Sequence, residues 1–351
     1  MEHISTIGLD TSKSVFQVHG FDAKGNDTLV KRLKRREVLA FFAKLPPCVV
    51  SLEACGSSHY WGREIKALGH VVKLVPPPFV KRFLSGRRKT DARDAKALAL
   101  AGQSAGLRAV PVKSQEQQAE GMAVKVRGLL VRQHTQIGNS LRAMIAEFGH
   151  TSAIGDKGLE ALIARVESAD AEVPKAALEA LAASVRQWRS LGEEIAKLTT
   201  LLLAKAKADP VVRRLMAVPG VGPLGAMVFV NKVNDPKRFK CGRDCSAWLG
   251  FVPNEHSTAG KVRRGSITKE GDEGLRTLMV LGAVSVLLHA RRNPATASPW
   301  VVEILKRRPF KVAAVALAAR NARTLWALLK HGTAFKQRRA TAVTPPTAAA
   351  A

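Results

Sequence analysis

The sequence predicts an α/β domain at the N-terminus, followed by a mainly helical remainder. Short β-branched runs alternate with helical stretches between residues 4 and 101, which is typical of a sheet with helices on its faces. Between residues 156 and 208 helix formers dominate and helix breakers are few. At Ala217 the pattern changes again, because a glycine- and proline-rich turn then separates apolar helices. A chain of 351 residues is long enough for two or three domains.

The strands and helices of the first part follow from local runs and from the breakers between them. Cys48–Leu52 is a short β-branched run, the mark of a buried strand. Pro46 and Pro47 stop the helix before it, and the three prolines from Pro76 end the last strand. We expect strands at residues 4–9, 15–21, 29–33, 48–52 and 70–75, and helices at 37–43, 59–68 and 91–101.

Two long helical stretches occupy the middle of the chain, at residues 114–148 and 156–208. Apolar residues recur every three or four positions from Leu191 to Leu202. This spacing predicts a helical hairpin or coiled-coil arm. An ordinary helical bundle that packs on its own domain is the alternative.

The last part begins with the turn Val218–Gly222 and continues with apolar helices near 275–288 and 312–329. The tail from Lys336 consists mainly of Arg, Thr, Pro and Ala, so we expect it to be disordered. The expected domains are an α/β domain (1–148), a helical coiled-coil arm (149–210), a mainly α C-terminal domain with a helix-hairpin-helix-like turn (211–335) and a tail (336–351).

The charge balance indicates a polyanionic partner. The chain has 56 Lys and Arg against 28 Asp and Glu, a net charge of +28. No apolar run approaches the roughly 18 residues needed to span a bilayer, so we expect no membrane-spanning segment. The N-terminus lacks the pattern of a secretion signal, and four cysteines are few, so we expect a cytoplasmic protein. With 5% aromatic residues, contact with phosphates fits better than a stacking platform for single strands.

Four acidic residues stand out in this basic chain. Asp10 and Glu53 end predicted strands, and Asp91 and Asp94 are three residues apart at the start of a predicted helix. Such carboxylates could converge at one edge of a sheet and hold Mg²⁺ or Mn²⁺. Two ions about 4 Å apart would clamp a phosphodiester. The alternative is that Asp10 caps a turn and Asp91 caps a helix.

Two further features suit a phosphate ligand. The basic run Arg87, Arg88 and Lys89 directly precedes Asp91, although it could also be a solvated loop. The Val-Pro-Gly-Val-Gly turn has the pattern of a helix-hairpin-helix, in which Gly220 and Gly222 would let backbone N–H groups approach a phosphate. A simple helix-ending turn is the other interpretation.

Taken together, several motifs resemble those of the DEDD transposases of the insertion-sequence 110 family, and within it the 1111-type subgroup. They occur in the family's order and span residues 4 to 335. The matching pieces are I-G-L-D-T-S-K (7–13), L-E-A-C-G (52–56), K-T-D-A-R-D-A (89–95), V-P-G-V-G (218–222), L-G-F-V-P (249–253), H-S-T-A-G-K (256–261), G-S-I-T-K-E-G-D (265–272) and N-A-R-T-L-W-A (321–327).

The resemblance implies an N-terminal RuvC-like domain of RNase H fold, a coiled-coil arm and a C-terminal transposase domain with a catalytic serine. The family's four acids fall on Asp10, Glu53, Asp91 and Asp94. Family members are recombinases guided by a structured bridge RNA that pairs with donor and target DNA. In this chain Ala259 replaces one glycine of the serine motif, which allows two alignments. The catalytic serine of the family aligns with Ser257 in one of them and with Thr258 in the other. We favour Ser257.

On this basis we expect Ser257 to attack a DNA phosphodiester and form a phosphoserine linkage, with Mg²⁺ at the four acids. We expect a dimer or tetramer in which the four acids of one protomer and Ser257 of another form a composite active site. We expect this oligomer to be associated with the bacterial nucleoid. The side chains expected to hold phosphates are those of Lys13, Arg87, Arg88, Lys89, His256, Lys261, Arg263, Arg264 and Lys269.

Two other functions remain open at this point. A RuvC-like nuclease would hydrolyse DNA with the four acids and water alone, without Ser257. A non-catalytic nucleic-acid-binding protein would need none of these residues. Cys241 and Cys245 have near-usable spacing for zinc, but no matching second pair follows, so we favour a buried pair of ordinary thiols.

Overall fold

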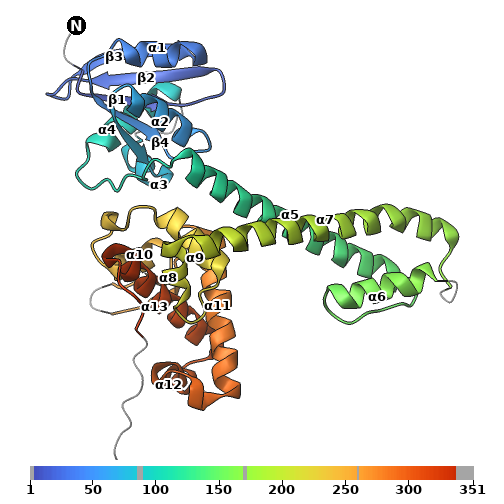
Figure 1. The fold of residues 1–351 in the computed structure, drawn as a ribbon. Helices are drawn as coiled ribbons and strands as arrows, with labels where there is room; N and C mark the ends of the chain where they lie inside the picture. The colour runs from blue at the N-terminus through green and yellow to red at the C-terminus, as the bar shows by residue number, and fades with distance from the viewer. Residues whose placement is uncertain (1–3, 85–89, 169–171, 259–260, 337–351) are drawn as a thin grey trace, which may run out of the picture. The chain divides into compact units, whose positions relative to one another are not determined.

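A computed structural model of the chain describes residues 4–84, 90–168, 172–258 and 261–336. It divides into two compact units, residues 1–118 and residues 119–351 (Figure 1). The first is a mixed α/β sheet domain, and the second is almost entirely helical. The predicted combination of an N-terminal α/β domain and a mainly helical remainder is confirmed. The tail predicted to be disordered begins at the last described residue, and the rest of it lies outside the described part of the chain.

Unit 1 is built on a five-stranded sheet in the order β3-β2-β1-β4-β5. The three N-terminal strands form an antiparallel meander, and β4 and β5 then add to β1 in parallel. Parallel neighbours need a crossover, and helices supply it here. All five strands were predicted, at slightly different bounds: β1 (Thr6–Asp10), β2 (Val15–Phe21), β3 (Asp27–Lys34), β4 (Val49–Glu53) and β5 (Val71–Val75).

Helices cover both faces of this sheet. On one face, α1 (Val38–Ala43) and α2 (Ser58–Ala67) pack on a core that includes Leu9, Phe16 and Leu52. On the other face lies α4 (Asp91–Gln103), while the short α3 (Pro77–Val80) follows β5. The side chains of β1 alternate between the two faces, so Leu9 enters the first core and Gly8 faces α4.

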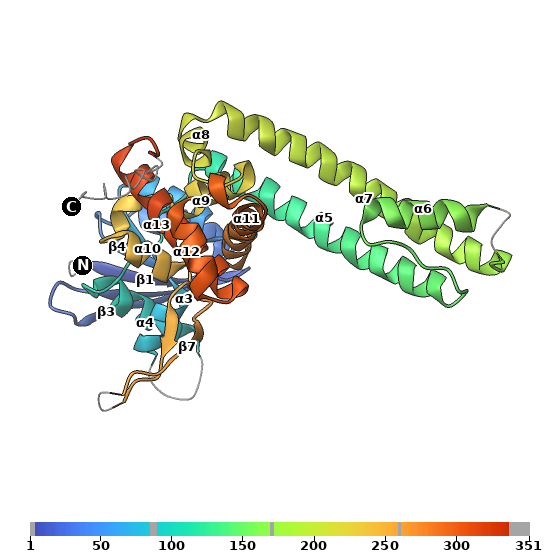
Figure 2. The same ribbon diagram turned by 90° about the horizontal axis from the view of Figure 1, so that it is seen from below.

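Unit 2 begins with an antiparallel helix pair (Figures 1 and 2). Helix α5 (Gln115–Ala146) runs along α7 (Lys175–Ala208), and the Arg127 guanidinium donates to the Thr199 hydroxyl at 2.6 Å. Near the turn of this hairpin, α6 (Asp156–Glu167) packs between them. Its core consists of Leu141, Ile145, Leu159, Leu162, Ile163, Val166, Leu181, Val185 and Trp188.

The structure therefore contains a helical hairpin in this region, and the partner of α7 is α5. Its classification as a coiled-coil arm, and the domain bounds at residues 148 and 210, stay predictions.

The remainder of unit 2 is a helical body with a small hairpin. Two of its helices, α10 and α12, and the two short strands were not expected from the sequence. Its core includes Leu215, Phe229, Cys245, Leu287 and Leu325, all fully buried. The elements are α8 (Pro210–Met216), α9 (Pro223–Val233), α10 (Gly242–Trp248), β6 (Pro253–Glu255), β7 (Arg264–Ile267), α11 (Glu273–Arg292), α12 (Pro299–Arg307) and α13 (Phe310–His331).

Helices α11 and α13 are long and apolar enough, by length and composition, to span a membrane. In the structure 28% and 50% of their apolar stretches are buried, and residues such as Met279, Leu287 and Leu317 lie in the core of unit 2. The expectation that no apolar stretch is long enough for a span is therefore wrong for these two helices. Core helices of globular proteins pass the same test, so two such helices are weak evidence of a membrane span.

Candidate active site

Asp10 and Glu53 leave the sheet side by side. Strands β1 and β4 are parallel neighbours, with Leu9 paired to Leu52, so the next residue of each strand is one of the two acids. The loops that follow are also close, since the Thr11 hydroxyl and the Cys55 thiol form a hydrogen bond at 3.5 Å. Two carboxylates are thereby held at the carboxyl edge of the sheet, as the sequence predicted.

Helix α4 brings its acids to the same side of the sheet. The backbone of α4 at Ala95 and Ala99 packs directly against Gly8, and Gly102 of the same helix packs against Ser51. Gly8 and Ser51 therefore face α4, and side chains two residues further along a strand share that face. Asp10 and Glu53 occupy those positions. The other two predicted acids, Asp91 and Asp94, lie in the first turn of α4.

The four carboxylates are not drawn together into a closed ligand set. Among the described residues, no group of three or more His, Cys, Asp and Glu side chains is close enough to hold a metal ion. Asp10, Glu53 and Asp94 are half-buried and Asp91 is exposed. Within the described ranges, the side chains of Glu53 and Asp91 make no hydrogen bond or ion pair. A donor set made only of partly exposed carboxylate oxygens fits a hard cation such as Mg²⁺ or Mn²⁺.

Ser257 lies on the exposed loop between β6 and β7. Its hydroxyl donates to Glu255 Oε1 at 3.0 Å and accepts the backbone N–H of Arg263 at 3.3 Å. The hydroxyl is thus held between a carboxylate that can take its proton and a donor that can stabilise the resulting oxyanion. Sequence reasoning missed Glu255. Its position two residues before the serine, on the same side of an extended chain, was the available signal.

Thr258 is held differently. Its backbone pairs with Lys261 in both directions, at 3.3 and 2.9 Å. Beside it, the His256 N–H donates to the Arg263 carbonyl at 2.8 Å. These bonds shape the loop, but no carboxylate among the described residues accepts the Thr258 hydroxyl. The local geometry therefore favours the serine over the threonine as the activated hydroxyl.

The base of this hairpin is rigidly built. Gly250 and Gly271 both have positive φ, at 75° and 76°. The backbone of Gly250 packs against residues 269–270, and the backbone of Gly271 packs against residues 248–249. A side chain at either position would be strained and would collide with backbone. The Arg276 guanidinium donates to the carbonyls of Leu249 at 3.2 Å and Glu270 at 2.7 Å. The two ends of the serine loop are therefore clamped together at the start of α11.

Asp272 anchors the same junction. Its carboxylate accepts the Leu275 N–H at 2.8 Å, which caps α11, and pairs with the Lys232 ammonium. Burial alone would raise the pKa of Asp272, but the hydrogen bonds from Lys232 and from the Leu275 N–H outweigh it and hold this pKa below its ordinary value. The charged carboxylate therefore stabilises the fold at neutral pH.

In a comparison with known proteins, the acid region and the serine hairpin match two models of the same transposase family. A family model of a DEDD transposase of the IS110 type matches residues 7–150, which include all four acids. A second model, described as the transposase IS116/IS110/IS902 family, matches residues 212–298, which include the serine hairpin. Together they cover more than half of the chain. The chain belongs to the IS110 family of transposases.

Several transposases resemble this one over almost their full length. A Sinorhizobium fredii protein described as a transposase is 44% identical over 338 residues, covering 96% of this chain and 87% of its own. A family 20 transposase of Pseudomonas aeruginosa is 42% identical, covering 95% and 99%. The transposase of insertion sequence element IS1111A from Coxiella burnetii is 33% identical, covering 96% and 92%. The present chain is accordingly an insertion-sequence transposase, an enzyme that recombines DNA.

The glycines of the Val-Pro-Gly-Val-Gly turn of this transposase have two different environments. Gly220 has φ of 82°, and its backbone lies against Gly282 of α11, so a side chain there would collide with that helix. Gly222 has open space around it and precedes α9. Close helix packing explains Gly220. Phosphate contact by either glycine stays a prediction.

The remaining predicted positions are distributed as follows. Cys245 is fully buried, and burial raises its pKa to about 12, whereas Cys241 is exposed. The expectation of a buried pair is therefore wrong for Cys241, whose side chain faces solvent. Arg87, Arg88 and Lys89 lie outside the described residues. The predicted phosphate-binding side chains that are described are all exposed: Lys13, His256, Lys261, Arg263, Arg264 and Lys269.

Proposed function

We propose that this transposase cuts and rejoins DNA through a covalent bond between Ser257 and a DNA phosphate. The observation that carries the proposal is the position of the serine hydroxyl between Glu255 and the Arg263 N–H. The Ser257 proton passes to Glu255 as Oγ attacks phosphorus. The bond from phosphorus to one bridging oxygen breaks, and that oxygen takes up a proton to become a strand-end hydroxyl.

Rejoining reverses these steps. A strand-end hydroxyl from the other DNA attacks the phosphoserine, its proton is taken by the protein, and the Ser257 oxygen leaves and is reprotonated by Glu255. One phosphodiester is consumed and one is formed, so no external energy source is needed.

We further propose that Asp10, Glu53, Asp91 and Asp94 would hold Mg²⁺, with Mn²⁺ as a substitute, in a RuvC-like domain of RNase H fold. The antiparallel meander followed by parallel strands, with acids at the carboxyl edge and at the start of α4, supports this assignment. When bound, the cation would polarise the reacting phosphate and stabilise the leaving oxygen. The carboxylates themselves position that charge, since the sheet and α4 fix where they lie.

The nucleic-acid partners belong to the same proposal. Transposition requires donor and target DNA, and the family resemblance adds a bridge RNA that pairs with both. A net charge of +28 is large enough for an RNA and a DNA together, and the exposed cations of the serine hairpin are placed to contact backbones. A homo-oligomer, dimer or tetramer, in the bacterial cytoplasm at the nucleoid is the proposed working form.

The test is strand exchange with the full chain, DNA carrying the element's end, target DNA, the RNA transcribed from that end, and Mg²⁺. Wild type should give a protein–DNA adduct on a denaturing gel. Ser257→Ala should abolish it and Thr258→Ala should retain it. An adduct that persists in Ser257→Ala and vanishes in Thr258→Ala would overturn the serine assignment. Activity that survives complete metal chelation would overturn the assignment of the acids.

A further inference from the structure

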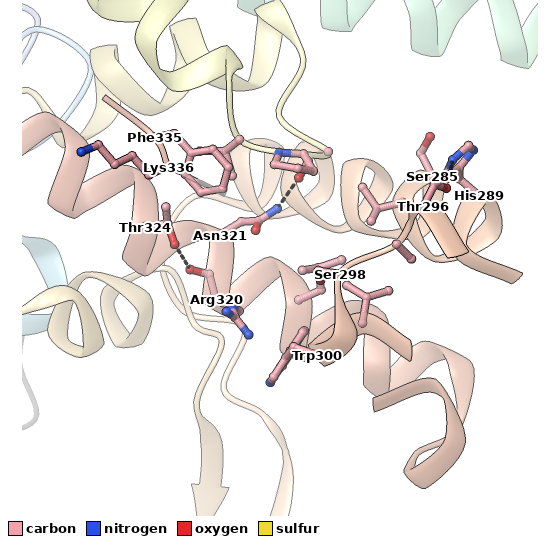
Figure 3. A pocket seen from close by; sticks show the side chains of 17 residues that line it. Ser285, His289, Thr296, Ser298, Trp300, Arg320, Asn321, Thr324, Phe335 and Lys336 are labelled. Carbon is pink, nitrogen blue, oxygen red and sulfur yellow. Dashed lines mark hydrogen bonds between the residues drawn. The ribbon is translucent and has the colours of Figure 1, made fainter. Parts of the chain in front are cut away.

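A cavity in unit 2 is lined by none of the acids and by no residue of the serine hairpin, although Gly220, predicted from the sequence to contact phosphate, lines it. It has a volume of about 520 Å³, within the range of roughly 300–1,000 Å³ that is usual for small-ligand sites. The Pro219–Gly220 turn, the C-terminal half of α11, the start of α12 and the middle of α13 enclose it (Figure 3). A second hollow shares Trp300 and Arg320 with it and adds Arg323.

The charge of the lining selects for an anion. Arg320 and Lys336 line the cavity, with His289 on the opposite side, and no Asp or Glu is among the described lining residues (Figure 3). A concave site that collects only one sign of charge attracts ligands of the other sign more strongly than a flat surface does.

The cavity also offers a flat aromatic surface. The Arg320 guanidinium lies over the Trp300 ring, 4.5 Å from its centre, and both side chains line the cavity. Trp300 is only half-buried, in contrast to the core tryptophans Trp61, Trp188 and Trp326. An aromatic ring and a guanidinium plane are the groups on which unpaired bases stack.

Polar groups for a base edge are present as well. The hydroxyls of Ser285 and Ser298 line the cavity and make no hydrogen bond with a described residue. The neighbouring Thr296 hydroxyl is occupied, since it lies 3.1 Å from His289 Nε2. Asn321 donates to the Pro219 carbonyl at 2.9 Å and so fixes the turn that forms one wall. The site is therefore built, with donors and acceptors left for a ligand.

We infer that this cavity receives one unpaired nucleotide of a DNA or RNA strand, with its base on Trp300 and its phosphate near Arg320 and Lys336. The shared chemistry is a planar base joined to a phosphate. A strand rather than a free nucleotide is favoured because the second hollow, which shares Trp300 and Arg320 with the cavity, adds the cation Arg323, and because this enzyme handles strands as its substrates. The inference does not depend on the serine chemistry proposed above.

The test uses full-length protein carrying Ser257→Ala, so that failure of the catalytic proposal cannot affect it. A short oligothymidylate with one 5-iodouracil is bound and irradiated, and the crosslinked peptide is mapped. The crosslink should fall on the segment that contains Trp300. Trp300→Leu should remove it and weaken single-strand binding about tenfold, while binding to duplex of the same length stays unchanged. Trp300→Phe should restore both signals.

Arg291→Gln is the matched control, because Arg291 stacks on Phe310 at 4.4 Å outside the cavity and carries the same charge. It should keep the crosslink, whereas Arg320→Gln should weaken it and make binding less salt-dependent. Oligouridylate in place of oligothymidylate decides between RNA and DNA. Crosslinks that map away from the lining, or wild-type binding by Trp300→Leu, would overturn the inference. Competition by free thymidine monophosphate would overturn the choice of a strand.

Discussion

The two candidate catalytic regions of this transposase are built in opposite ways. The acids are separated by long stretches of sequence and are positioned by tertiary structure, through the pairing of β1 with β4 and the packing of α4 on Gly8. Ser257 obtains both of its hydrogen-bond partners from residues 255–263 of one hairpin. The acid region therefore depends on the whole of unit 1, whereas the serine hydroxyl is positioned by its own hairpin.

The first prediction concerns the local partner of the serine. Glu255→Gln keeps the size of the side chain but removes a proton acceptor. Formation of the protein–DNA adduct should slow by about 10²- to 10⁴-fold, the usual contribution of a general base. Quenched-flow sampling on denaturing gels measures this rate. Unchanged adduct formation in this variant would mean that Glu255 only shapes the loop.

The second prediction separates function from stability in unit 1. Glu53 makes no side-chain bond with a described residue, so Glu53→Gln should leave the thermal unfolding temperature unchanged. Strand exchange should still fall by about 10²- to 10³-fold, because a carboxylate that positions charge is lost. Asp27→Asn is the matched control, since Asp27 pairs with Lys96 at 2.8 Å and with His19 at 2.7 Å.

The control should show the reverse pattern, with slightly lower stability and full activity. Equal stability losses in both variants would contradict a functional role for Glu53.

The third prediction tests the tertiary positioning of the acids. In Gly8→Ala the added methyl group meets the Ala95 carbonyl and the Ala99 N–H of α4, so the helix must shift. Unit 1 should lose about 3 kcal/mol of stability, and strand exchange should fall with it. Gly56→Ala, with open space around the added group, should behave like wild type in chemical denaturation. A stable, active Gly8→Ala protein would refute the described packing.

The fourth and smallest effect belongs to the base of the serine hairpin. Asp272→Ala removes a helix cap and an ion pair, which should cost about 1–2 kcal/mol at neutral pH. The folded-state pKa of Asp272 is lowered, so its contribution is present above the ordinary value of 3.8 and is lost as pH falls through the lower folded value.

Urea unfolding of wild type and variant across this pH range measures the difference. The two curves should converge in acid, and Asp272→Asn, which keeps the cap, should lie between them. A difference that stays constant with pH would contradict the charged cap.

The same contrast explains what sequence alone could predict. Buried strands such as Val49–Glu53 and the long helices are visible because apolar periodicity and breakers mark them. The hairpin of β6 and β7 was missed, since its strands of three and four residues are polar and show no alternation. Asp10 and Asp91 were recognisable from strand and helix ends. Glu255 was missed: its position two residues before Ser257 was visible, but the loop conformation that brings its carboxylate to the Ser257 hydroxyl was not.

The pairing of α7 was also beyond sequence reasoning. Periodicity identified an apolar stripe on that helix, but a stripe does not name its partner. In the structure the partner is α5, through contacts such as Gly138 with Trp188. Helix pairing at this sequence distance is decided by tertiary packing, which a single sequence does not specify.

The central claim is that Ser257 becomes covalently attached to DNA. The direct measurement is to trap the adduct with wild-type protein in the presence of Mg²⁺, digest protein and DNA, and sequence the modified peptide by mass spectrometry. A nucleotide-modified peptide with its phosphate on Ser257 is the expected result. A phosphate on Thr258, or DNA cleavage with no modified peptide at any residue, would contradict it.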